Sequence, residues 1–65
     1  MNTQEMKGRW KELKGKAKAR WGKLTDDDLT QVEGRAEELT GKIQARYGVA
    51  RDEARRQVDE FCSAC

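Results

Sequence analysis

The sequence of 65 residues lacks proline and histidine and contains few large apolar side chains. Without histidine, one chain can form neither a histidine-based catalytic triad nor a zinc site of the usual composition. Leu, Ile, Val and Phe together account for only nine residues, so any hydrophobic core must be small. No apolar run is long enough for a membrane-spanning helix or for a signal peptide. We therefore expect one small domain without a cofactor, which is not an enzyme.

The residues that are present favour helix. Ala, Glu, Lys and Arg are abundant, and these are strong helix formers. Charged residues make up 40% of the chain, but the net charge is only +2. Repulsion between like charges therefore does not prevent folding.

The chain contains an internal repeat with an offset of 26 residues. Nine of the fifteen residues at 8–22 are identical to those at 34–48, and Trp21 corresponds to Tyr47. A weaker match continues beyond these blocks, so residues 8–33 and 34–59 form two copies of one unit. Two copies are fewer than a solenoid needs, and we expect them to pack on each other as a closed pair.

Each copy is expected to form a long helix followed by a shorter one. In the first copy, apolar residues from Met6 to Leu24 recur at the spacing of one helical face. Gly22 and Gly48 are expected to end the two long helices, because glycine readily adopts the left-handed conformation. The sequence leaves open whether the helix is continuous across Glu33 and Gly34.

Polar residues indicate where the shorter helices begin. Thr25 is expected to cap the first of them, with Asp28 as its partner in a capping box. Asp52 is expected to cap the second. The sequence therefore predicts an all-α fold, a small bundle of about four helices in two αα-hairpins over residues 1–61, with residues 62–65 as a flexible tail. The residues expected in the core are Trp10, Leu13, Trp21, Leu24, Leu29, Val32, Leu39, Ile43, Tyr47, Val58 and Phe61.

Two blocks of sequence are distinctive: W-G-K-L-T-D-D-D-L at 21–29, preceded by W-K at 10–11 and L-K-G-K at 13–16, and G-K-I-Q-A-R-Y-G at 41–48. With these blocks, the chain resembles the CsbD-like family of small bacterial proteins associated with general stress responses. The resemblance covers roughly residues 5–61 and implies a compact bundle of short helices in a stress-induced bacterial cytoplasmic protein. It implies no mechanism and no catalytic residue. The tail Cys62-Ser63-Ala64-Cys65 differs from what the family leads us to expect.

The charges are unevenly distributed along the chain. Residues up to Thr25 carry a net charge of +6, and the remainder carries −4. A basic amphipathic first helix could bind the phosphates of nucleic acid or another polyanion. The alternative is a solvated face that pairs with the acidic half of the same molecule. The candidate polyanion-binding residues on one side of the apolar stripe are Lys7, Lys11, Lys14 and Lys18.

The six glycines are spaced by seven within each copy, at 8, 15 and 22 and at 34, 41 and 48. Helical geometry places this ladder on the face opposite the apolar stripe. The ladder could allow close approach of a second copy, giving a homo-oligomer, or it could be a duplicated feature without function. The Cys62-x-x-Cys65 pair follows a helix and so lacks the activation that a helix N-terminus gives to redox cysteines.

Two functional hypotheses follow. In the first, the chain is a hydrophilic stress protein that protects other macromolecules without a defined site. In the second, it is a binding module for DNA, RNA or another polyanion. The sequence identifies no metal ligands, cofactor motif or paired catalytic carboxylates.

Overall fold

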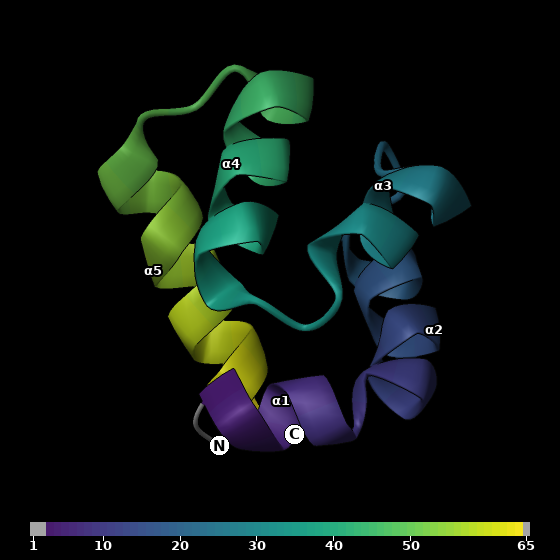
Figure 1. Ribbon diagram of the computed structural model, residues 1–65. Helices are drawn as coiled ribbons and strands as arrows, with labels where there is room; N and C mark the ends of the chain where they lie inside the picture. The colour runs from purple at the N-terminus through teal and green to yellow at the C-terminus, as the bar shows by residue number, and fades with distance from the viewer. Residues whose placement is uncertain (1–2, 65) are drawn as a thin grey trace.

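The computed structural model describes residues 3–64, which form five α-helices and no β-strand within that range. Figure 1 shows α2 beside α3 on one side of the molecule, α4 beside α5 on the other, and α1 across the base. The predicted all-α class is confirmed. In chain order, the helices are α1 (Thr3–Gly8), α2 (Trp10–Arg20), α3 (Asp26–Val32), α4 (Ala36–Tyr47) and α5 (Arg51–Ala64).

The two sequence copies contain the same order of helices. A shift of 26 residues places the first residue of α2, Trp10, on the first residue of α4, Ala36. The same shift places Asp26, the first residue of α3, on Asp52 in the first turn of α5. The second helices differ in length, since α3 has 7 residues and α5 has 14.

A fifth helix arises because the chain leaves the helical path at Arg9. The sequence suggested one long helix through this region, but Arg9 has φ −110° and ψ 13°, which separates α1 from α2. The carbonyl of Arg9 still accepts hydrogen bonds from the N–H groups of Glu12 and Leu13, so the break leaves this backbone acceptor satisfied. The change of direction carries Met6 to the far end of the core, where it is fully buried.

The predicted capping box is present at the start of α3. The N–H of Asp28 donates to Thr25 Oγ1 over 3.0 Å, and the N–H of Thr25 donates to Asp28 Oδ2 over 3.1 Å. Gly48 ends α4 in the left-handed conformation, with φ 66°, as predicted. These two local signals were correct because each depends only on residues within one turn.

Two other expected helix ends differ from the structure, the first only in its conformation. Gly22 directly follows the C-cap residue Trp21, as predicted for the residue after α2, but it is not in the left-handed conformation. Asp52 is not the cap of α5, because this helix begins at Arg51. Asp52 lies instead in the first turn of α5, where its negative charge interacts favourably with the positive end of the helix dipole.

The helices enclose one hydrophobic core. Ten of the eleven residues expected there are buried, and the exception is Tyr47, which is partly buried against the core. Tyr47 stays at the edge because its hydroxyl accepts a hydrogen bond from the N–H of Lys23 over 3.2 Å. No buried side-chain nitrogen or oxygen among the described residues lacks a hydrogen-bond partner. The buried apolar residues are Met6, Trp10, Leu13, Ala17, Trp21, Leu24, Leu29, Val32, Ala36, Leu39, Ile43, Ala54, Val58 and Phe61.

The two copies meet at a sharp turn, which settles the question of continuity that the sequence left open. Glu33 and Gly34 both have positive φ, 52° and 78°, and they separate α3 from α4. A Cβ atom on Gly34 would lie 2.6 Å from Lys7 Cα and 2.9 Å from Met6 O. Gly34 is therefore buried against the backbone of α1 and does not belong to the outward ladder expected for it.

The glycines inside α2 and α4 do lie on the outside. A Cβ atom on Gly15 or Gly41 would meet nothing within 4 Å. We expect Gly15→Ala and Gly41→Ala each to raise the free energy of unfolding by about 1 kcal/mol, because alanine restricts the unfolded chain and favours helix. Urea denaturation measures this gain. A loss of stability in either variant would show that the glycine is required in its folded surroundings.

The end of the chain differs from the expected tail. Helix α5 continues to Ala64, so the first three of residues 62–65 are helical, and Cys65 lies outside the described residues. The Cys62 side chain is partly buried against the core, with its sulfur 3.4 Å from Met6 Sδ. Even α5, the longest helix in residues 3–64, has neither the length nor the apolar character to cross a bilayer.

Candidate functional site

The four lysines proposed for polyanion binding are divided between two helices. Lys7 lies on α1, whereas Lys11, Lys14 and Lys18 lie along one side of α2. The break at Arg9 therefore removes Lys7 from the row that the sequence predicted, and it leaves a row of three.

Two of the three lysines on α2 donate hydrogen bonds to neutral oxygen atoms. Lys14 Nζ donates to Thr30 Oγ1 over 2.9 Å, and Lys18 Nζ donates to the carbonyl oxygen of Leu24 over 2.6 Å. Among the described residues, none of the four candidate lysines lies within 4 Å of a carboxylate. Within residues 3–64, these four positive charges therefore have no carboxylate partner at short range.

Internal pairing occupies other basic residues of this half. Arg9 pairs with Glu12 at 3.4 Å, and Arg20 of α2 pairs with Glu60 of α5 at 3.1 Å. Arg20 also lies over the Trp21 ring, 5.4 Å from its centroid. Within residues 3–64, Arg9 and Arg20 therefore pair with carboxylates, whereas the four candidate lysines do not.

The two tryptophans belong to the core. Trp10 Nε1 donates to the carbonyl oxygen of Leu29 over 2.8 Å, and Trp21 Nε1 donates to Gln57 Oε1 over 2.9 Å. The Trp21 ring also packs against Phe61, with centroids 5.1 Å apart. Neither ring is free to stack on a base, so nucleic-acid binding would depend on phosphate contacts.

The strongest charged cluster centres on Asp28, whose side chain is 6% exposed. Arg46 donates to both carboxylate oxygens, from Nε over 2.9 Å and from Nη2 over 3.1 Å. Lys42 Nζ lies 3.8 Å from the same carboxylate. The hydrogen bonds from Arg46 and then from the N–H of Thr25 lower the pKa of Asp28 from 3.8 to about 2, although burial acts in the opposite direction. Asp28 is therefore a fixed negative charge that joins α3 to α4.

Sequence reasoning treated Asp28 only as a capping residue and did not identify its partner. The signal available was the recurrence of Ala-Arg at 19–20 and 45–46, in the last turn of each long helix. Both arginines form an ion pair with a helix of the other copy, Arg20 with Glu60 and Arg46 with Asp28. The repeat thus conserves the position of the arginine but not of its partner.

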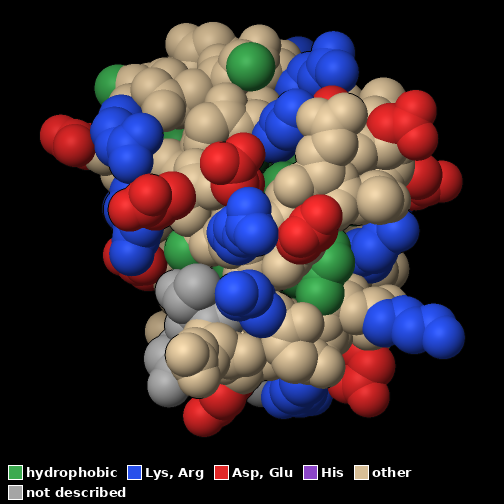
Figure 2. All heavy atoms as spheres, in the orientation of Figure 1, with side chains coloured by type: hydrophobic (Ala, Val, Ile, Leu, Met, Phe, Trp, Pro, Cys, Tyr) green, Lys and Arg blue, Asp and Glu red, His purple; other side chains and the backbone are tan. Residues whose placement is uncertain are grey.

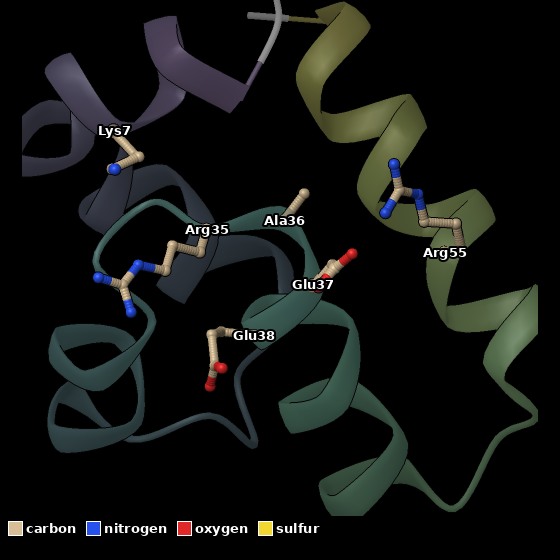
Figure 3. A pocket seen from close by; sticks show the side chains of 6 residues that line it. All are labelled: Lys7, Arg35, Ala36, Glu37, Glu38 and Arg55. Carbon is tan, nitrogen blue, oxygen red and sulfur yellow. The ribbon is translucent and has the colours of Figure 1, made fainter.

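A pocket of about 350 Å³ lies where α1, the start of α4 and α5 come together. In Figure 3, the side chain of Glu37 extends toward Arg55, whereas the guanidinium group of Arg35 is directed to the opposite side. The charged groups that line this pocket therefore do not converge on one point. Its lining residues are Lys7, Arg35, Ala36, Glu37, Glu38 and Arg55.

Residues 3–64 contain no group of three or more Cys, Asp or Glu side chains placed to hold a metal ion. Cys62 contacts Met6 through its sulfur, and its motif partner Cys65 lies outside the described residues.

Comparison with known proteins places this architecture among bacterial relatives. A UPF0337 protein of Bordetella pertussis is 57% identical over 61 residues, which cover 94% of this chain and 92% of that protein. UPF0337 protein YjbJ of Escherichia coli K12 is 63% identical over 30 residues, and a UPF0337 protein of Pectobacterium atrosepticum is 62% identical over 32 residues. These two shorter matches cover 46% and 49% of this chain, and 44% and 46% of those proteins. The family described as CsbD-like matches residues 4–56, and the chain belongs to this family.

Proposed function

We propose that this chain is a non-enzymatic protein of the bacterial general stress response, which acts in the cytoplasm by protecting other macromolecules through its hydrated, charged surface. The observation that carries the proposal is the character of that surface. No large hydrophobic side chain is exposed among the described residues. Lysine, arginine, aspartate and glutamate side chains are intermixed over the face in Figure 2. Such a surface remains hydrated at high concentration and resists aggregation through exposed apolar patches.

The absence of enzymatic activity is part of the proposal. General acids and bases at neutral pH need a pKa near the working pH. Asp28, the most buried carboxylate, has its pKa lowered to about 2 and stays ionised. The charged pocket is lined by exposed side chains apart from Ala36, so it offers no desolvated reaction site.

The test is recovery of a drying-sensitive enzyme after desiccation and rehydration. We expect greater recovery with the folded chain than with an equal mass of a globular protein of low surface charge. The Leu39→Ala variant, which keeps the composition but is expected to unfold, separates the effect of the folded surface from that of composition. Equal recovery with the chain and with the low-charge protein would contradict the proposal.

A second candidate function is binding of a polyanion such as DNA or RNA. The specific observation in its favour is that Lys11, Lys14 and Lys18 form a row on α2 without a carboxylate within 4 Å in the described chain. Phosphate groups could approach this row and release their counterions, which is the main source of affinity in sequence-independent binding.

Charge reversal tests this second function. We expect the triple variant Lys11→Glu, Lys14→Glu and Lys18→Glu to lose retardation of duplex DNA at low salt. For wild type, three phosphate contacts predict a logarithmic salt dependence of binding with a slope of about −3. Reversal of Arg35, Arg51 and Arg55 to glutamate changes the net charge equally and serves as the matched control. Binding lost equally in both variants would show a dependence on net charge and contradict a site on α2.

A further inference from the structure

Ion pairs connect the two halves of the chain, and the end of each long helix takes part in one of them. At the end of α2, Arg20 pairs with Glu60 of α5, one residue beyond the second copy as defined by residues 34–59. At the equivalent position in α4, Arg46 pairs with Asp28 of α3, which is in the first copy. The last turn of each long helix is thus bound by the second helix of the opposite copy.

The aromatic residues that follow these arginines repeat the arrangement. Trp21 Nε1 donates to Gln57 in the second copy, and Tyr47 Oη accepts from the N–H of Lys23 in the first. Each copy therefore receives the long-helix end of the other, but the packing is not symmetric, because α3 packs on α4 more closely than α2 packs on α5.

Equivalent glutamines also lie at this interface. Gln57 accepts from Trp21, and its counterpart Gln31 accepts from Lys42 Nζ over 2.7 Å. Both hydrogen bonds cross between the copies. A copy from a second molecule has the same sequence, so it could provide every one of these contacts.

The covalent connection between the copies is short and strained. Glu33 has φ 52° and ψ 31°, a left-handed conformation that is unfavourable for a residue with a side chain. Gly34 follows with φ 78°, and Arg35 is extended with φ −86° and ψ 121°. Short strained connections of this kind favour exchange of identical elements between molecules.

We propose that residues 33–35 act as a hinge through which two copies of this chain exchange their repeats to form a closed dimer. In the dimer, α3 and α4 join into one helix over 26–47, about 33 Å long at 1.5 Å per residue. The first copy of each chain then packs on the second copy of its partner. The links of Arg20, Trp21, Lys42 and Arg46 re-form between chains, and the left-handed strain at Glu33 is released.

Gly34→Ala tests the hinge. Its Cβ atom would lie 2.6 Å from Lys7 Cα and 2.9 Å from Lys7 N in the monomer, and alanine favours the continuous helix. We expect the dimerisation constant to rise at least about tenfold, which corresponds to 1.4 kcal/mol. The mass measured by light scattering should shift from 7.5 kDa toward twice that value as concentration increases.

Gly48→Ala is the matched control for the hinge variant. Gly48 also has positive φ, 66°, but a Cβ atom there would meet nothing within 4 Å. This variant should lose stability and remain a monomer. A Gly34→Ala chain that stays monomeric at all concentrations, whether folded or unfolded, would overturn the proposal, as would equal dimerisation of both variants.

Charge exchange between two chains gives a second test that does not require Gly34 to change. An Asp28→Arg chain and an Arg46→Asp chain each place like charges together in the monomer. When the two chains are mixed, an exchanged heterodimer restores opposite charges at both sites. We expect the mixture to form a heterodimer that native mass spectrometry identifies, with recovery of helicity.

Both substitutions in one chain restore the pair within a monomer and serve as the control. Unchanged masses and helicity on mixing would overturn the exchange of copies.

Discussion

Leu39→Ala is expected to leave the protein largely unfolded at 25 °C. Leu39 is fully buried in α4, the helix that packs against both α3 and α5. Replacing a buried leucine by alanine costs about 2–5 kcal/mol, from lost burial and from the cavity that remains. A single core in a chain of this size supplies about 3–5 kcal/mol of stability in total, so the loss is comparable with the whole. Far-UV circular dichroism and amide dispersion in NMR spectra measure the loss.

The repeat provides a companion to this substitution. Leu13 occupies the equivalent position in the first copy and is also fully buried, so Leu13→Ala should destabilise the fold by a similar amount. Val49→Ala is the control, because Val49 follows α4 in the chain and is only partly buried against the core. This substitution should lower the free energy of unfolding by at most about 1 kcal/mol. If the free energy of unfolding of the Leu39→Ala chain lies within about 1 kcal/mol of the wild-type value, the prediction is wrong. The core would then have collapsed around the cavity.

The sequence predicted those parts of the fold that depend on neighbouring residues. Apolar spacing placed Leu13 and Leu39 in the core, and the Thr25 and Asp28 pattern located the start of α3. These predictions succeeded because helical periodicity and capping act within one or two turns.

Features that depend on distant parts of the chain could not be predicted in this way. The close approach of Gly34 to the backbone of Lys7 joins residues 27 positions apart, and glycine periodicity had suggested an outward face. The bidentate pairing of Arg46 with Asp28 spans 18 positions. Local sequence showed the Asp28 cap but gave no means of choosing among several arginines for its partner.

The pairing of Arg46 with Asp28 leads to the second large expected effect, a pH-dependent loss of stability in Asp28→Asn. The asparagine side chain has one acceptor oxygen and no charge. It therefore cannot replace the carboxylate, whose two oxygens each accept a hydrogen bond from Arg46. We expect the thermal midpoint of Asp28→Asn to lie well below that of wild type at pH 7. In wild type, the pKa of Asp28 is lowered from 3.8 to about 2 by folding, so the unfolded state takes up the proton first. The stabilisation is therefore present above pH 3.8 and is lost as the pH falls through about 2.

The difference in thermal midpoint between wild type and Asp28→Asn should consequently be constant from pH 7 to about pH 5. It should then decrease steadily toward pH 2. Thermal unfolding of both proteins over this range measures it. Asp26→Asn and Asp27→Asn are matched controls, since both residues are exposed in the first turn of the same helix. These two substitutions remove the same charge from the helix N-terminus but no bond to Arg46, so their effects should be small.

A difference for Asp28→Asn that is the same at pH 2 and pH 7 would show that the lost stability comes from packing or capping. A narrowing difference would identify the charge on Asp28 as the link between the two copies.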